Sequence, residues 1–200
     1  MNEIKNDPFA SIKLPEYRNL IAGRFLFIMG LRMMGTLVGW WVYNLTNDPF
    51  AIGLIGLSEV IPAITMALYA GHIIDLSEKR KVLLTGVALY FTAVLVLLFL
   101  STSYTSQHLT NHWIAIWIYV IIFFTGIIRA FTGPTMGVLV AQIVPKEILQ
   151  NATTWNQGTW LSASVTGHAV AGFLIAAFDI SGTLIAVCTL IIVICCVLYR

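Results

Sequence analysis

The sequence predicts an all-α, polytopic membrane protein with six transmembrane helices. Of its 200 residues, 58% are hydrophobic and only 10% are charged, and its mean hydropathy is +0.87. A globular chain has about a quarter charged residues, so this composition excludes a soluble enzyme. The second observation is a series of six apolar runs, which match in length the about 20 residues that a helix needs to cross a bilayer.

The apolar runs follow a polar tail of residues 1–18. They cover residues 19–43, 51–71, 82–100, 113–143, 152–178 and 183–199. The fourth run is longer than one crossing needs and is interrupted at Gly133 and Pro134. Pro62 in the second run predicts a kink beside Glu59, because proline cannot donate the backbone hydrogen bond of a helix.

Lysine and arginine are distributed asymmetrically between the runs. The connections around Asn47, Ser106 and Asp179 contain neither residue type, whereas the alternate connections and both chain ends contain them. Because short loops rich in Lys and Arg stay cytoplasmic, both termini are predicted to be cytoplasmic. The residues that support this topology are Lys5, Lys13, Arg18, Lys79, Arg80, Lys81, Lys146 and Arg200.

The charge and cysteine content argue against several partners. A formal net charge of +2 supplies no basic stripe for nucleic-acid phosphates, so no nucleic-acid partner is expected. The cysteines have no metal-ligand or redox spacing, and we expect no metal, no cofactor and no disulfide. The three cysteines are Cys188, Cys195 and Cys196.

Four ionisable residues stand in the middle of apolar runs, where an unpaired charge is costly and therefore marks a candidate functional position. They are Arg32, Glu59, Arg129 and His168. Arg24 lies nearer the cytoplasmic end of the first run, and we expect its guanidinium to reach the lipid headgroups.

Arg32 and Glu59 are predicted to lie at similar depth, because they are roughly 16 Å and 12 Å from the outer ends of their helices at 1.5 Å per residue. One interpretation is a cavity-facing pair that exchanges a proton or is opened by a charged substrate. The alternative is a permanently closed ion pair, since buried pairs are weak evidence of any one role. Glu59 is the only carboxylate in the middle of a run, which makes it the best candidate for protonation.

The remaining intramembrane positions suggest other roles. Arg129 lies roughly 24 Å from the outer face, level with the loop that contains Asp75. We expect His168 to be neutral and hydrogen-bonded within the bundle, with a proton relay as the alternative. Glycines four residues apart predict close helix contacts. They are Gly35 with Gly39, and Gly133 with Gly137.

The loop after the second run contains, in residues 71–83, a glycine, an aspartate four residues later and a basic pair. This pattern resembles the signature between helices two and three of the major facilitator superfamily, although Leu76 and Glu78 replace its usual arginine and second glycine. The matching residues are Gly71, Asp75, Lys79, Arg80 and Leu83. The fourth run contains Gly126, Arg129 and Gly133, which resemble a second signature of that superfamily.

The fifth run resembles the antiporter signature through Gly167 and Gly172, with His168 in the place of its proline. Residues 43–46, 144–145, 151–152 and 155–156 look like the efflux branch that contains the enterobactin exporter and macrolide exporters. Together these likenesses extend over nearly all of the chain after Pro15.

The resemblance implies one half of a transporter fold, built from two inverted three-helix repeats. It further implies a second six-helix half, so we expect a fragment of a bacterial inner-membrane transporter of about twice this length, with a homodimer as the less favoured arrangement. The implied substrate cavity is lined by Arg32, Trp40, Phe123 and Arg129. Proton coupling is assigned to Glu59 and Arg32. A cytoplasmic latch is assigned to Gly71, Asp75, Lys79, Arg80 and Arg129, and the helix-five motif to Gly167, His168 and Gly172.

The function implied by the resemblance is proton-coupled efflux of a small amphipathic molecule, such as a drug or a siderophore, by alternating access. An apolar, aromatic cavity with two arginines suits an amphipathic or anionic molecule. The alternatives are a proton-coupled importer and a non-transporting membrane scaffold that retains a half-transporter fold. The expected partners are the lipid bilayer, protons, a small-molecule substrate and the second half.

Overall fold

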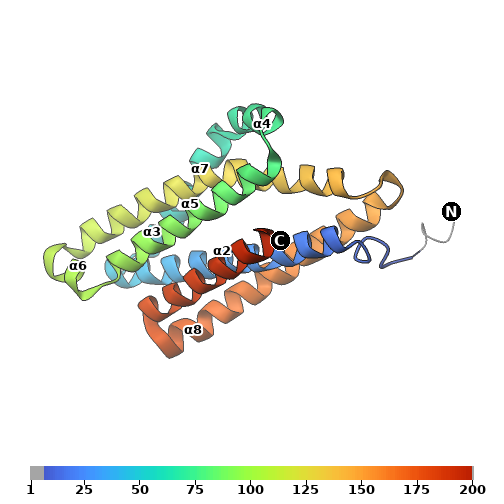
Figure 1. The fold of residues 1–200 in the computed structure, drawn as a ribbon. Helices are drawn as coiled ribbons and strands as arrows, with labels where there is room; N and C mark the ends of the chain where they lie inside the picture. Colours follow the sequence, from blue (N-terminus) through green and yellow to red (C-terminus); the bar gives the residue numbers. More distant parts are fainter. Residues whose placement is uncertain (1–6, 200) are drawn as a thin grey trace.

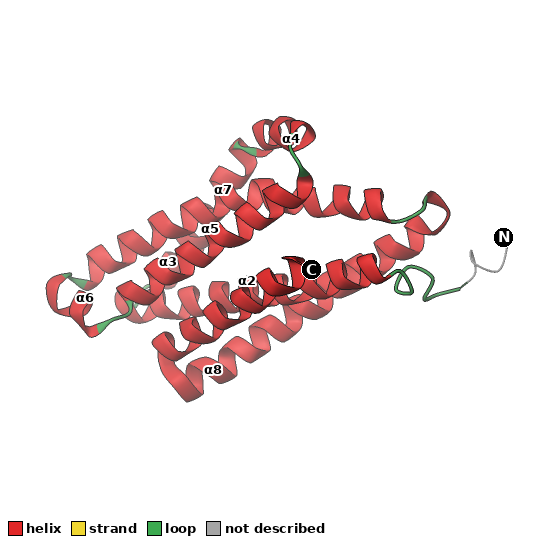
Figure 2. Ribbon diagram, viewed as in Figure 1, coloured by secondary structure: helices red, strands yellow, loops and turns green. Residues whose placement is uncertain are grey.

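Helices form almost all of the chain. The computed structural model describes the backbone of residues 7–199 and the side chains of residues 7–195. Lys5 and Arg200, which were counted for the topology, lie outside the described residues. Within them no strand occurs (Figure 2), which confirms the all-α prediction. The elements are α2 (Pro15–Thr46), α3 (Pro49–Thr65), α4 (Ala67–Leu76), α5 (Lys79–Leu100), α6 (Ser103–His108), α7 (Asn111–Ile143), the 3-10 turn η1 (Lys146–Ile148) and α8 (Leu149–Tyr199).

Four helices in the described part are long and apolar enough to cross a membrane, and the bent pair of α3 and α4 makes a fifth candidate span. The long helix α8 contains one residue with non-helical backbone angles, Asp179, with φ 55° and ψ −167°. Figure 1 shows the chain folding back there, so that α8 consists of two arms side by side. The reversal falls between the fifth and sixth apolar runs of the sequence.

Local sequence explains the sharp turn between α2 and α3. Asn47 ends α2 with left-handed backbone angles, a conformation that asparagine tolerates better than most residues. The Asp48 carboxylate then accepts a hydrogen bond of 2.9 Å from the Phe50 amide, and Pro49 occupies the first turn of α3. This is the usual start of a helix, a side-chain cap followed by proline.

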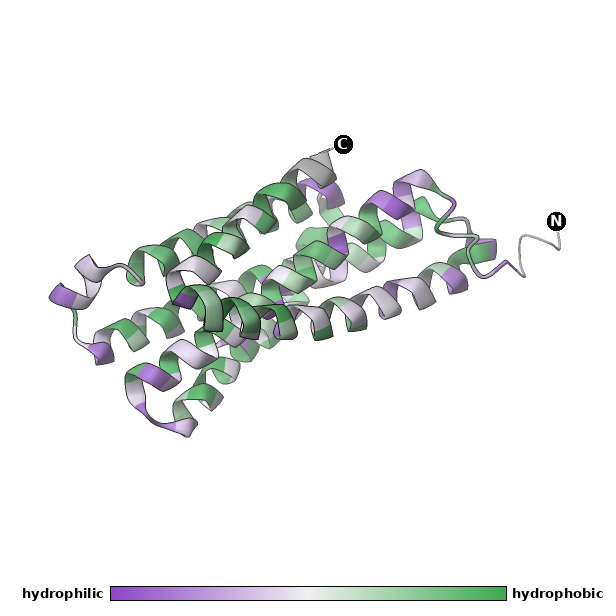
Figure 3. Cartoon of the chain, turned by 90° about the horizontal axis from the view of Figure 1, so that it is seen from below, coloured by the Kyte–Doolittle hydropathy of each residue, from purple (hydrophilic) through white to green (hydrophobic). Residues whose placement is uncertain are grey.

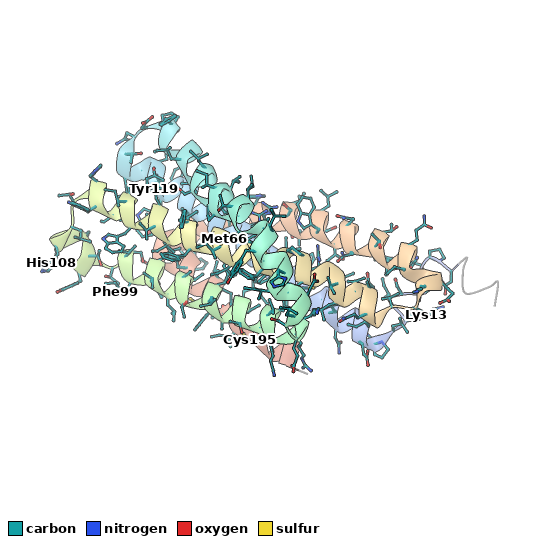
Figure 4. All side chains as sticks on the ribbon, turned by 90° about the horizontal axis from the view of Figure 1, so that it is seen from above. Lys13, Met66, Phe99, His108, Tyr119 and Cys195 are labelled. Atoms are coloured by element: carbon teal, nitrogen blue, oxygen red, sulfur yellow. The ribbon has the colours of Figure 1, made fainter. Side chains whose placement is uncertain are left out.

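The predicted kink beside Glu59 lies elsewhere. α3 remains helical through Pro62, and the chain bends by 53° between α3 and α4. The break is at Met66 (Figure 4), whose amide still donates to the Pro62 carbonyl at 3.0 Å. Thr65 just before the break also donates its hydroxyl to backbone carbonyls, at 3.0 Å to Ile61.

The two largest apolar clusters join most of the helices of the bundle. The larger one joins α2, α3, α5, α7 and both arms of α8. The smaller one lies at the end of the molecule that contains the N-terminal segment, where Tyr17, Leu83 and Val140 pack together. Figure 4 shows Lys13 at this end and His108 at the opposite end. Hydrophobic residues run along the helices, and many hydrophilic residues gather in the turns and near the N-terminus (Figure 3).

The close helix contacts use different glycines from those predicted. A Cβ atom added at Gly35, Gly133 or Gly137 would have open space, and one at Gly39 would only touch Ile52 at 3.9 Å. The tight contacts are instead at Gly86, Gly126 and Gly167. The i, i+4 spacing alone therefore did not identify the packing glycines, because it carries no information on which face of a helix meets a neighbour.

Candidate functional site

A cavity of about 250 Å³ lies between α2, α3, α5, α7 and α8. All four intramembrane ionisable residues singled out in the sequence line it, and so does Arg24. The polar lining consists of Arg24, Arg32, Glu59, Thr125, Arg129, Thr132, Trp160 and His168. Leu83 and Met136 line the cavity and also belong to the smaller apolar cluster. Phe27, Met34, Ile55 and Ile122 line it as well and belong to the larger cluster, so the cavity borders both clusters.

Glycine determines how closely α3 approaches α7 at the cavity. A Cβ atom at Gly126 would lie 2.2 Å from the backbone oxygen of Glu59 and 2.7 Å from Pro62, distances that only glycine avoids. Arg129 follows almost one helical turn later, on the same side of α7. Its Nη1 atom donates to Glu59 Oε1 at 2.6 Å.

Glu59 is thus paired with Arg129, and not with Arg32 as the sequence predicted. Depth counted along the helices put Glu59 roughly 12 Å and Arg129 roughly 24 Å from the outer face, so it did not predict this pair. Helix packing decides the neighbour, and α3 packs far more extensively on α7 than on α2. The Glu59 side chain is 33% exposed and that of Arg129 45% exposed. The pair faces the cavity and is not sealed in the core.

A second glycine brings α2 against the first arm of α8. A Cβ atom at Gly167 would lie 2.7 Å from the Met29 carbonyl and 2.8 Å from Arg32 Cβ. The Arg32 guanidinium carbon lies 5.5 Å from the centre of the Trp160 ring, within the range of a cation–π contact. No ion pair of Arg32 is found among the described residues.

His168 is hydrogen-bonded within the bundle, as expected. Its Nδ1 atom lies 2.7 Å from Thr36 Oγ1, and the Thr36 hydroxyl oxygen lies 3.0 Å from the Arg32 carbonyl oxygen. A hydroxyl has one proton to donate, so Nδ1 of His168 is the donor to Thr36 when the Thr36 proton points to the Arg32 carbonyl, and the acceptor when that proton points to Nδ1.

The predicted latch between Asp75 and Arg129 is not formed. Arg129 binds Glu59, and Lys79 Nζ donates to the backbone oxygen of Asp75 at 3.0 Å. Asp75 is exposed, because the opposite side of α4 packs through Ala70 and Ile74. Of the other motif positions, Gly71 and Gly172 face open space, and Arg80 lies in the first turn of α5.

Two predicted cavity residues do not line the cavity. Trp40 is 50% exposed and Phe123 is 40% exposed, and neither belongs to the lining. Their neighbours Trp41 and Ile122 are buried, so the aromatic side chains lie on outward faces of α2 and α7. Their assignment to a cavity between two transporter halves stays a prediction.

The sequence analysis missed one cavity-lining residue, Trp160, and one residue behind the lining, Tyr90, and it assigned Arg24 elsewhere. Trp160 stands in the middle of the fifth run, far from the interfaces that tryptophan prefers, and this anomaly was a usable signal. Tyr90 is a buried phenol in the middle of α5 that donates to the Thr125 carbonyl at 3.1 Å and packs edge-on against Phe27. Arg24 faces the cavity instead of the headgroups, and its Nε atom is buried without a hydrogen-bond partner.

A polar cluster fastens the N-terminal segment to the start of α8. The Pro8 carbonyl accepts hydrogen bonds from Asn151 Nδ2 at 2.7 Å and from Trp155 Nε1 at 2.8 Å. The Ser11 hydroxyl donates to Asn151 Oδ1 at 2.6 Å, and the Tyr17 hydroxyl to the Ala152 carbonyl at 2.6 Å. We call these residues the N-terminal clasp. Residues that suggested the efflux branch in the sequence, at 151–152 and 155, thus make structural contacts here.

Comparison with known proteins agrees with the helical architecture. A family model described as Major Facilitator Superfamily matches residues 20–200. No curated protein and no solved structure matches the chain.

Proposed function

Because the chain belongs to the Major Facilitator Superfamily, a family of membrane transporters, we propose that it exports small amphipathic molecules in exchange for protons by alternating access. Membership makes it an integral membrane transport protein. The direction of transport, the substrate and the coupling ion are the parts that we propose. The lipid bilayer, protons and the transported molecule are then its partners.

The proposed topology has six crossings. They are α2, the bent pair of α3 and α4, α5, α7 and the two arms of α8. The distribution of Lys and Arg supports cytoplasmic termini, and we place the protein in a bacterial cytoplasmic membrane. The bundle would form one half of the transporter, from two inverted three-helix repeats, and rock against a second six-helix half in the same full-length chain or, less favoured, against a second copy.

The observation that supports proton coupling is the ion pair of Glu59 and Arg129 at the cavity wall. Glu59 is the only carboxylate among the cavity-lining residues. Protonation would remove the charge that Arg129 binds and so weaken one contact between α3 and α7. A proton that binds one packing arrangement better than another shifts the equilibrium between them. Arg32, which the sequence grouped with Glu59, takes its place on the substrate side of the cavity.

The cytoplasmic latch of Gly71, Asp75, Lys79, Arg80 and Arg129 remains part of the proposal. We assign it to the other state of the cycle, because Arg129 binds Glu59 here. Release of Arg129 by protonation of Glu59 would make its guanidinium available to Asp75. One arginine would then alternate between two carboxylates, which links the proton site to the closing of the cytoplasmic side.

The test is transport by the full-length protein in proteoliposomes under an imposed pH gradient, with anionic, neutral and cationic amphipathic dyes. We expect at least one dye to move against its gradient, and the Glu59→Gln variant to abolish this movement while the protein stays folded. Glu16→Gln is the matched control, because Glu16 is an exposed carboxylate on α2 outside the cavity. Unchanged transport by Glu59→Gln would refute proton coupling through this residue.

Two other functions are outcomes of the same experiment. Movement of the dye in the same direction as the protons would indicate an importer, a reading that the histidine in the place of the antiporter proline leaves open. Absence of movement for every dye, in protein that remains folded, would favour a membrane scaffold.

A further inference from the structure

Arg24 is oriented toward the cavity by the periodicity of α2. Several residues of α2 line the cavity at spacings of one, three or four residues, which places them on one side of the helix. They include Arg24, Ile28, Leu31, Arg32 and Gly35. A buried donor without a partner is unfavourable, and Nε of Arg24 is such a donor. The side chain therefore offers a hydrogen bond that no described residue accepts.

The neighbouring helix brings an aromatic residue to the same level. α2 and the first arm of α8 run in the same direction with a constant offset, because Tyr17 bonds to Ala152 and Arg32 contacts Gly167, both 135 residues apart. This register places Arg24 level with residue 159, next to Trp160. Trp160 also lies against the Arg32 guanidinium, so it lies between the levels of the two arginines.

The charges around the cavity do not balance. Three arginines and one glutamate line it, and that glutamate is bound by Arg129. Neither Arg24 nor Arg32 has a carboxylate partner among the described residues. Arginine stays charged at any pH that a protein tolerates, so it cannot relieve this excess by losing a proton. An uncompensated charge away from water needs a counter-ion.

We propose that Arg24, Arg32 and Trp160 form an anion subsite, and that the transported molecule is an amphipathic anion with a carboxylate, sulfonate or similar planar or compact acidic group. The Arg32 guanidinium lies over the indole without a carboxylate partner among the described residues, so its N–H groups are available for hydrogen bonds to acidic oxygens. Phe27, Ile28 and Met136 offer apolar surface to the rest of the molecule. The proposal rests on the transport function proposed above, because it names the charge class of the substrate.

The two guanidinium groups are closer together than their positions on the helix suggest. Eight residues of helix separate the Cα atoms by about 12 Å, but the Arg32 guanidinium lies against Trp160, which is almost level with Arg24. One acidic group between the two arginines would therefore accept hydrogen bonds from both, directly or through water. The ion pair of Glu59 and Arg129 on the facing helices stays separate from this contact.

Binding of three matched probes tests the subsite without requiring transport. The probes are 2-naphthalenesulfonate, the neutral 2-naphthalenesulfonamide and the cationic 2-naphthyltrimethylammonium, titrated calorimetrically into the full-length protein in phosphatidylcholine nanodiscs. We expect the sulfonate to bind at least about tenfold more tightly than the other two, in line with charge-assisted hydrogen bonds. Arg24→Gln and Arg32→Gln should each remove about this factor for the sulfonate and change sulfonamide binding less than about twofold.

Arg18→Gln is the matched control, because Arg18 is an exposed arginine on the same helix and lies outside the cavity lining. Arg24→Lys, which keeps the charge and removes the planar fork, should give an intermediate loss for the sulfonate and replaces Arg24→Gln if that variant does not fold. Equal binding of the three probes by the unmodified protein, or an equal loss of all probes in the arginine variants, would overturn the proposal.

The phosphate group of an anionic lipid is an alternative ligand for the two arginines, so the sulfonate titration is repeated in phosphatidylglycerol nanodiscs. A sulfonate affinity within about threefold of the value in phosphatidylcholine supports a substrate site. Loss of sulfonate binding in phosphatidylglycerol would assign the arginines to anionic lipid and overturn the proposal. Selective sulfonate binding without any dye transport would leave the subsite standing and refute the transport proposal. Proton-coupled transport without selective binding of the sulfonate would leave the transport proposal standing and refute the subsite.

Discussion

The cavity is bounded by two helix crossings that are built alike and charged differently. In the α3–α7 crossing, Gly126 lies against the Glu59 carbonyl, and in the α2–α8 crossing, Gly167 lies against the Met29 carbonyl. Each crossing presents one arginine to the cavity. Arg129 in the first is neutralised by a carboxylate, whereas Arg32 in the second lies on an indole.

The difference suggests how one cavity accommodates two tasks. A carboxylate–arginine pair responds to protonation, because loss of the negative charge removes its main attraction. A guanidinium on an aromatic ring keeps its charge and remains available to an acidic ligand. The α3–α7 crossing is thus suited to respond to protons and the α2–α8 crossing to bind substrate, and the predictions below test this division.

The largest expected effect comes from filling the glycine contacts. Gly126→Ala should lower the free energy of unfolding by about 1–3 kcal/mol, because the new methyl group overlaps a backbone carbonyl that cannot rotate away. Gly167→Ala should cost less, since its contacts at 2.7 and 2.8 Å are longer than the 2.2 Å at Gly126. Thermal unfolding in detergent measures both, with Gly137→Ala as the control that faces open space. Equal stability of Gly126→Ala and Gly137→Ala would contradict this account of the crossing.

A double-mutant cycle asks which arginine is energetically coupled to Glu59. Glu59→Gln combined with Arg129→Gln should show a coupling of about 0.5–1 kcal/mol, a modest value because both side chains are partly exposed. The cycle with Arg32→Gln should give a coupling near zero, within about 0.3 kcal/mol. Unfolding in mixed detergent micelles provides the free energies. A larger coupling to Arg32 would restore the pairing predicted from the sequence.

The contrast between these two arginines also shows what the sequence was able to predict. Charged residues in apolar runs are costly, so Arg32, Glu59, Arg129 and His168 were identifiable as site residues, and all of them line the cavity. Helical rise, counted from the ends of the apolar runs, wrongly placed Arg129 at a different level from Glu59. It also did not give the direction in which the Glu59 side chain points, which depends on how α3 packs against α7 at Gly126.

The same limit explains the other differences. Arg24 was assigned to the headgroups from its nearness to the helix end, but rotation about the α2 axis places it on the cavity side with Ile28 and Arg32. Trp40 does not line this cavity, although its helix does, and its neighbour Trp41 is the buried one. The superfamily, by contrast, was predictable, because its signatures are local in sequence, and the family comparison confirms it.

The two crossings also differ in their polar fastening. The α2–α8 pair is held at the N-terminal end by the clasp. The α3–α7 pair has the ion pair of Glu59 and Arg129 at the cavity and, toward the opposite end, a bond from the Tyr119 hydroxyl to the Ala51 carbonyl at 3.1 Å. Asn151→Ala should increase amide exchange in residues 8–14 about fivefold to tenfold, since it removes hydrogen bonds worth about 1 kcal/mol or more. Gln150→Ala is the matched control, an exposed neighbour on the same turn. Identical exchange in the two variants would show that the clasp does not hold the segment.

The smallest effect is expected at the ion pair beside the clasp. The Lys13 ammonium, together with the Phe9 amide, holds the pKa of the Asp7 carboxyl below its usual value of 3.8. A lowered pKa in the folded state means that this group contributes stability above pH 3.8 and loses it as the pH falls through the lower folded value. The ratio of amide exchange in residues 8–14 between Asp7→Asn and the unmodified protein cancels the intrinsic effect of pH. This ratio should exceed one slightly at neutral pH and approach one in acid. High salt should also bring the ratio closer to one, because Asp7 and Lys13 are solvent-accessible. A ratio that rises in acid would contradict the assigned sign.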